Sequence, residues 1–175
     1  MRRPLGSLVI VAVGLLLGAG LVGAESGAAA DPDIAEVTVG AVIAEAQPPV
    51  VFLMEKGGKR TLPISVGPTE AQAISLELER VVPARPLTHD LLKTVLEKLQ
   101  ARVRRIVITE MRNRIFYAVI ILEQGKGEIT IDARPSDAIA LALRMKAAMY
   151  VARKVLDAQG VEIPPRDREQ RTVPL

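Results

Sequence analysis

Residues that could carry chemistry gather in one segment of the chain, DARPSDAIALALR, from Asp132 to Arg144. Asp132 and Asp137 flank Arg134 and Ser136, directly before an apolar run that is typical of a helix. If a strand-to-helix turn brings the two carboxylates together, they could hold one Mg²⁺ or Mn²⁺, while Arg134 and Ser136 bind a phosphate. The alternative is structural: Asp137 stabilises the helix start, Asp132 bonds a loop backbone, and Arg134 bonds a carboxylate or loop carbonyls.

The only histidine is a second candidate for the same chemistry. His89 follows Thr88, a residue type favoured at the N-cap, so we expect it on the first turn of a helix. The positive end of a helix disfavours a protonated imidazole, which would keep His89 neutral and able to act as a general base. The alternative is an exposed first-turn residue. Asp90 beside it is read as a helix-end acid.

Positive charge is concentrated in the stretch 102–114. It holds five arginines around one acid, Glu110: Arg102, Arg104, Arg105, Arg112 and Arg114. Such a cluster could bind phosphates, with Arg105 and Arg112 as candidate contacts, or form the solvated edge of a hairpin. Glu110, at the end of an expected strand, could reach a bound cation or be a plain surface residue.

Composition limits the classes of function. The 175 residues include no cysteine, which excludes disulfides, thiolate catalysis and Cys-ligated zinc. The few aromatic residues argue against a protein that stacks successive bases of a single strand on aromatic platforms. Without Arg2 and Arg3 of the leader described next, 21 basic residues face 20 acidic ones (23 − 2 = 21), so net charge says little about nucleic acid.

The first residues predict export. Met1-Arg2-Arg3 is basic, the run 5–22 is apolar, and Val22-Gly23-Ala24 offers a cleavage point. Residues 1–24 are therefore predicted to be a signal peptide, or an uncleaved membrane anchor as the alternative, followed by a linker over 25–33. The domain, over 34–158, is then periplasmic or extracellular, and 159–175 is expected to be a mobile tail.

The domain is predicted to alternate short strands and helices. Strands are expected over 34–46, 50–55, 60–66, 103–110, 115–122 and 128–133. Helices are expected over 68–80, 88–100, 135–146 and 151–158. In the helix over 88–100, one apolar stripe lies opposite the charged residues, and it comprises Leu91, Leu92, Val95, Leu96 and Leu99.

The chain contains an internal sequence repeat. Shifted by 67 residues (135 − 68 = 67), 50–76 lies on 117–143, so that Gly58 meets Gly125 and Pro68 meets Pro135. A glycine turn, a strand and a helix start coincide in the same order, which indicates two β-β-β-α units from a duplication. The predicted fold class is therefore α+β, with a mostly antiparallel sheet and packed helices.

The two copies differ at the candidate site. Helix capping explains Glu70 and Asp137, but only the second copy has Asp132 and Arg134, which indicates that the second copy is the functional one. The helix that follows carries no charge over 138–143 and must be covered on more than one side, so we expect a homo-oligomer.

Four stretches together resemble the bifunctional nuclease domain family: LPISVGPTEAQAISLELE, RPLTHDLL, RIVITEMRNRIFYAVIIL and IDARPSDAIALALRMKAAMYVA. The resemblance covers about 34–157, and it implies cleavage of DNA and RNA by small bacterial and plant proteins. The hairpin tip departs from the family, because Arg112-Asn113-Arg114 stands where an acidic or glycine turn is common.

For a nuclease, phosphodiester hydrolysis needs a positioned water, a base or metal, and positive charge near the phosphate. His89, Glu110, Asp132 and Asp137 are the catalytic candidates, and the two aspartates are the candidate metal ligands. The alternative is a non-catalytic oligomeric module that binds a phosphorylated ligand or a partner protein. Low charge and few aromatic residues favour it modestly.

Overall fold

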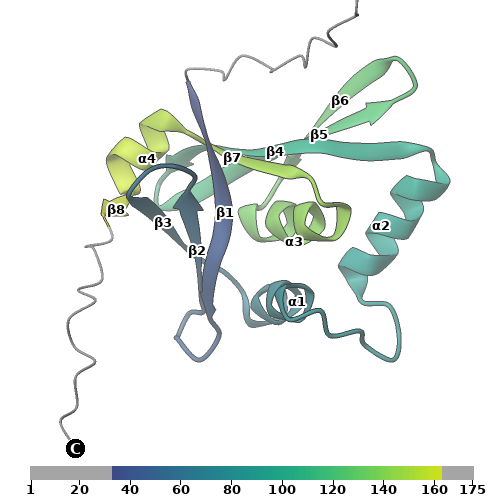
Figure 1. Cartoon of the computed structure of the whole chain (residues 1–175), viewed down its shortest axis with the longest axis horizontal. Helices are drawn as coiled ribbons and strands as arrows, with labels where there is room; N and C mark the ends of the chain where they lie inside the picture. Colours follow the sequence, from purple (N-terminus) through teal and green to yellow (C-terminus); the bar gives the residue numbers. More distant parts are fainter. Residues whose placement is uncertain (1–32, 163–175) are drawn as a thin grey trace, which may run out of the picture.

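A computed structural model describes residues 33–162, which form one eight-stranded sheet with four helices (Figure 1). The strands are β1 (Ile34–Ile43), β2 (Val50–Glu55), β3 (Arg60–Ser65), β4 (Ala101–Arg112), β5 (Ile115–Gln124), β6 (Gly127–Ala133), β7 (Ala148–Ala152) and β8 (Val161–Glu162). The helices are α1 (Pro68–Leu78), α2 (Thr88–Lys98), α3 (Pro135–Met145) and α4 (Arg153–Gln159). The leader, nearly all of the linker and most of the tail lie outside the described residues. Export and membrane anchoring therefore stay predictions.

The sheet has the order β6-β5-β4-β7-β1-β2-β3-β8. All neighbours pair antiparallel except β4 and β7, which are parallel. The α+β class is confirmed. At the end of the sheet, β8 pairs Val161 and Glu162 with Thr61 and Arg60, where the sequence predicts only tail.

Two β-β-β-α units are present, β1-β2-β3-α1 and β4-β5-β6-α3, and each places its strands side by side in chain order. The helix starts at Pro68 and Pro135 keep the predicted shift of 67. The turn glycines with positive φ are Gly57 (φ 71°) and Gly125 (φ 60°), a shift of 68 (125 − 57 = 68). The pairing of Gly58 with Gly125 was therefore off by one residue, because a left-handed backbone, not sequence identity, defines the equivalent turn position.

The strand β7 joins the two units. It lies between β4 and β1 and buries Met149 and Val151, whereas the sequence predicted a helix from Val151. The helix α4 begins two residues later, at Arg153. A five-residue strand carries too few residues to show its period, and its parallel partner β4 is remote in sequence.

The helix α3 is the centre of the helical layer. It packs on β4, β5 and β7, with α1 and α2 beside it (Figure 1). From Ala138 to Ala142 every residue is at most 1% exposed, so a single chain covers the uncharged helix. The reason for expecting a homo-oligomer from this helix is therefore removed.

The apolar stripe of α2 is mostly uncovered. Of its five residues only Leu96 is buried, and Leu91, Val95 and Leu99 are 59%, 44% and 57% exposed. The helix contacts α3 and β4 along one edge, through which His89 and Leu96 enter the interior. Across residues 33–162 no helix combines the length and hydropathy that a membrane crossing requires.

Candidate functional site

Four charged or polar side chains from three helices form one connected network. It comprises Glu70 of α1, His89 of α2, and Arg134 and Asp137 at the start of α3. We call it the Arg134 network. The network joins both duplicated units, because Glu70 belongs to the first and Arg134 to the second.

The helix starts place these groups. Each of α1, α2 and α3 has an acid at its third residue, Glu70, Asp90 or Asp137, where the positive end of the helix favours a carboxylate. Proline opens α1 and α3, a position where its missing N–H costs no hydrogen bond. Packing of α3 between α1 and α2 then brings the first turns of the three helices together.

Arg134 is the centre of the network. Its Nε donates to Asp137 Oδ2 at 2.7 Å, and its Nη2 donates to Asp137 Oδ1 at 3.0 Å and to Glu70 Oε1 at 2.7 Å. Two carboxylates therefore fix the guanidinium, although the side chain is 65% exposed. Within residues 33–162 its Nη1 donates no hydrogen bond, so this edge of the fork is available to an outside anion.

His89 is buried, and the alternative of an exposed first-turn residue is therefore wrong. The residue is 8% exposed, and its Nε2 lies 3.1 Å from Asp137 Oδ1. Because a carboxylate only accepts, the neutral ring carries its proton on Nε2 and keeps Nδ1 as an acceptor. A base oriented by a carboxylate is the arrangement that proton abstraction requires.

Charge in the network is held by mutual pairing. Burial raises the pKa of Asp137, but hydrogen bonds from Arg134 and His89 outweigh it and leave the pKa below its usual value. The hydrogen bonds to Asp137 and Glu70 raise the pKa of Arg134 further above its already high value. At neutral pH Asp137 is therefore an anion and Arg134 a cation.

A second, structural link lies beside the network. The interpretation of Asp90 as a helix-end acid is confirmed, because its Oδ2 accepts from the Leu87 backbone N–H at 2.8 Å. Its Oδ1 accepts from Arg144 Nε at 2.6 Å, and Arg144 also donates to the carbonyls of Ala140 and Ala73. Arg144, whose side chain is 4% exposed, therefore locks α3 to α1 and α2.

The other predicted catalytic residues lie apart from the network. Asp132 is exposed on β6, and no hydrogen bond or ion pair joins its side chain to another residue in the range 33–162. Glu110 pairs with Arg112 at 3.2 Å and faces α4 across a small cavity that Lys154 also lines.

The arginines of the cluster have separate roles. The Arg112 guanidinium lies 4.4 Å from the centre of the Tyr117 ring, and the buried Nε of Arg105 has no hydrogen-bond partner in the described part of the chain. Arg102 and Arg104 pair with Glu123 along the sheet, as the hairpin-edge alternative predicts.

The metal interpretation finds little support in the donor set. Both oxygens of Asp137 accept from Arg134 or His89, so a guanidinium already stands where a cation would bind. Among residues 33–162, no three His, Cys, Asp or Glu side chains gather as a metal site. Binding of Mg²⁺ or Mn²⁺ by Asp132 and Asp137 stays a prediction.

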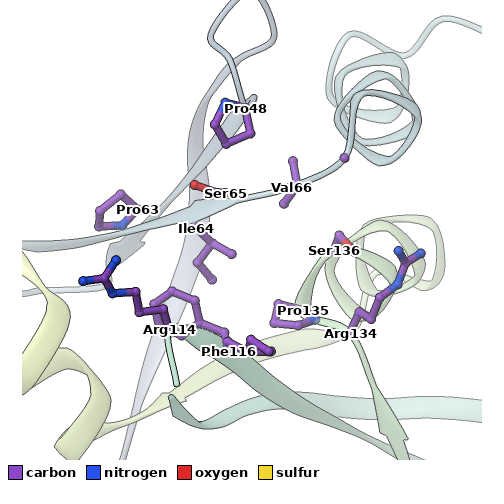
Figure 2. Close-up of a pocket in the computed structure, with 12 residues that line it drawn as sticks. Pro48, Pro63, Ile64, Ser65, Val66, Arg114, Phe116, Arg134, Pro135 and Ser136 are labelled. Carbon is purple, nitrogen blue, oxygen red and sulfur yellow. The ribbon is translucent and has the colours of Figure 1, made fainter. Parts of the chain in front are cut away.

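A cleft of ≈ 410 Å³ opens on the other side of Arg134 (Figure 2). The strand-to-helix turns of both duplicated units line the cleft. Ser65, Val66 and Gly67 precede α1, while Arg134, Pro135 and Ser136 open α3. The tip of the β4–β5 hairpin completes the wall with Arg114, Ile115 and Phe116. Ser136, a predicted substrate-binding residue, is therefore at the cleft.

Sequence reasoning missed two residues of this region, Glu70 and Arg144. Glu70 had been assigned to helix capping alone, yet it holds Arg134. The signal that could have found it is the repeat itself, because Glu70 and Asp137 occupy equivalent places on helices that pack together. The signal for Arg144 is that it is the one charged residue of α3 after the apolar run 138–143.

Comparison with known proteins agrees with the geometry. The model of the bifunctional nuclease domain matches residues 51–164. A protein of Mycobacterium tuberculosis (strain H37Rv), described as uncharacterized, is 40% identical over 124 residues, which cover 71% of this chain and 74% of that protein. Bifunctional nuclease 1 of Oryza sativa subsp. japonica is 31% identical over 117 residues, and bifunctional nuclease 1 of Arabidopsis thaliana 28% over 119 residues.

The matched regions cover 65% and 66% of this chain and 35% and 37% of the two plant proteins. The chain thus spans about a third of the length of these plant relatives. The family model nevertheless includes β2 to β8, and with them all four residues of the Arg134 network. The chain belongs to the bifunctional nuclease domain family.

Proposed function

We propose that the protein is a nuclease that hydrolyses phosphodiester bonds of DNA or RNA at the Arg134 network. The observation that carries the proposal is the pair of buried His89 and half-buried Asp137 beside an arginine that two carboxylates hold in place. A base, its orienting acid and a fixed cation are the parts that acid–base cleavage of a phosphodiester needs.

Each group has a role that its contacts support. Nη1 of Arg134 donates to a phosphate oxygen and stabilises the negative charge that grows as water attacks. Nδ1 of His89 takes the proton of that water, while Asp137 stabilises the resulting imidazolium. The P–O bond to the leaving sugar oxygen breaks as the bond from water forms, the leaving oxygen takes a proton from solvent, and the imidazolium then returns its proton to solvent. Glu70 is a positioning residue, because it holds Arg134 without facing the phosphate. No step in this scheme passes through a metal.

The test is cleavage of single- and double-stranded DNA and RNA by the purified protein and by Arg134→Lys. Lysine keeps the charge but lacks the planar fork that bonds Asp137 twice, Glu70 once and still presents Nη1 to a phosphate, so we expect cleavage to fall about 10²-fold or more. The control is Lys59→Arg, in the turn between β2 and β3. It also exchanges lysine and arginine, but away from the network, and should leave cleavage unchanged. A wild-type protein that cleaves none of these substrates, with or without Mg²⁺ and Mn²⁺, would contradict the proposal.

A chelator arm separates the two catalytic schemes. Activity that survives chelation supports the His89–Asp137 base. Activity that Asp132→Asn and chelator abolish alike would instead support a cation held by Asp132 and Asp137.

We also propose that the chain self-associates through the exposed stripe of α2. Leu91 and Leu99 lie four residues to either side of Val95 and are exposed with it. A two-fold axis through Val95 would pair Leu91 with Leu99 of a second copy, so that the exposed apolar side chains of the two copies cover one another.

A further inference from the structure

The cleft beside the Arg134 network has the features of an anion site at one end. The N-cap of α3 is Arg134, which supplies no capping acceptor, and Pro135 has no N–H. The Ser136 and Asp137 backbone N–H groups precede the first helical hydrogen bond, which Ala138 donates to Arg134. Free N–H groups at a helix start favour a negatively charged ligand.

A serine hydroxyl at the same end is a second sign of a ligand. Ser136 is 7% exposed and lines the cleft, and its hydroxyl makes no hydrogen bond to any other residue from 33 to 162. Figure 2 draws its oxygen between Val66 and Arg134, two other residues of the wall. The packing around Ser136 holds the side chain in place, and its hydroxyl is free to bond a ligand in the cleft.

Arg114 gives the opposite wall a positive charge at a structural cost. It occupies the second turn position of the β4–β5 hairpin with φ 64°, where Asn113 before it has φ 50°. Such two-residue turns favour glycine at this place, because a side chain is strained in the left-handed region. Arg114 is exposed and forms no ion pair within the described range, so folding does not explain the arginine.

The space between these walls is apolar and small. Phe116, Pro63 and Ile64 line it, and a volume of ≈ 410 Å³ lies near the lower end of small-molecule sites, about 300–1,000 Å³. One ring system can lie against Phe116 while its phosphate reaches the start of α3. A base pair with two backbones does not fit such a space.

We propose that this cleft binds one unpaired nucleotide, with its phosphate on Ser136 and the first N–H groups of α3, its base against Phe116, and Arg114 of the opposite wall in contact with the far side of the nucleotide. The inference rests on the proposed function and narrows its substrate to single-stranded nucleic acid, with the neighbouring phosphodiester at Arg134. The scarcity of aromatic residues is compatible with this site, because the site needs one aromatic ring for one base and not a series of rings for successive bases.

Calorimetric titration with adenosine 5′-monophosphate, adenosine and inorganic phosphate tests the site without any turnover. We expect the nucleotide to bind at least tenfold more tightly than either part. Arg114→Gly should weaken it about tenfold while leaving the unfolding midpoint unchanged or higher, since glycine relieves the turn. Ser136→Ala should lower the affinity for the nucleotide and for phosphate but leave the affinity for adenosine unchanged.

The matched control is Arg80→Gly. Arg80 has φ 57° at the end of α1, so the change removes the same charge and the same strain away from the cleft. A single-stranded oligonucleotide should displace the nucleotide, and a duplex of equal length should not.

Equal affinity for adenosine and its monophosphate, equal effects of the two glycine variants, or displacement by duplex would overturn the inference. Tight nucleotide binding without cleavage of any nucleic acid would support the cleft as a nucleotide site and refute the nuclease proposal.

Discussion

Arg134 is the residue on which the site depends. It is the N-cap of α3, yet its guanidinium bonds Glu70 of the other unit, so the two copies of the repeat complete one site. The expectation that the second copy is the functional one stays a prediction, although an acid of the first copy holds its arginine. It follows that Glu70→Gln, a change in the first copy, should also disturb the site.

The pKa of Asp137 predicts how stability depends on pH. Because its folded pKa lies below the ordinary 3.8, the pairing with Arg134 and His89 stabilises the fold fully above that value. This contribution is lost as the pH falls through the lower, folded pKa. Denaturant unfolding of the wild type and Asp137→Asn should therefore differ above about pH 4 and converge as the pH falls below that value. A difference that does not shrink below about pH 4 would contradict the pairing.

Gly67 predicts the role of Glu70. A Cβ at Gly67 would lie 2.2 Å from Glu70 Oε2, so Gly67→Ala should push the carboxylate off Arg134 and slow cleavage while the protein stays folded. The matched control is Gly58→Ala, whose Cβ would lie 2.2 Å from Glu55 Oε2 at a distant hairpin. We therefore expect Gly67→Ala to cleave more slowly than Gly58→Ala, while the unfolding midpoints show that both variants are folded. Equal cleavage rates in the two variants would show that Glu70 is not part of the site.

At the scale of elements, the sequence predicted most of the fold because the signals are local. The β-favouring residues of β2 and β5, proline at the starts of α1 and α3, and the shift of 67 all fall within a few residues or one repeat. The strand β7 could not be found this way, since its stability comes from β1 and β4 on either side. Burial of α2 was overestimated because amphipathicity does not say which stripe finds a partner.

The site was predictable only in part for the same reason. The motif at the start of α3 led to Arg134, Ser136 and Asp137, and the single histidine led to His89. His89 and Asp137 are 48 residues apart in the sequence, and no local signal indicates that their side chains are in contact. The same holds for the contact between Arg134 and Glu70. Those contacts depend on how three helices pack.

Arg144 predicts the strength of that packing. Arg144→Met keeps the apolar stem but leaves Asp90 and the Ala73 carbonyl without their donor, which should lower the free energy of unfolding by about 1–3 kcal/mol. Denaturant titration measures the loss. Lys93→Met breaks the exposed pair with Glu97 and should cost only about 0.3–0.5 kcal/mol. Equal losses would show that Arg144 does not hold the three helices together.

At the scale of the whole molecule, the proposed self-association depends on α2, which stands at the rim of the helical layer (Figure 1). Val95→Glu would place two like charges on the proposed two-fold axis, so light scattering at tens of micromolar should change from a multiple of the 18.8 kDa chain to the monomer. Gln100→Glu adds the same charge beyond the end of the helix and should leave the assembly intact. A wild-type protein that is already monomeric would contradict the proposal.

We propose that Asp137 serves catalysis by orienting His89 and holding Arg134. The most direct measurement is the cleavage rate of Asp137→Asn, which keeps the shape of the side chain and removes its charge. Asp157→Asn is the matched control, because it removes another carboxylate that an arginine, Arg60, binds on the far side of the molecule. We predict a fall of about 10²–10³-fold for Asp137→Asn and none for Asp157→Asn. A folded Asp137→Asn protein that cleaves at the wild-type rate would contradict the account.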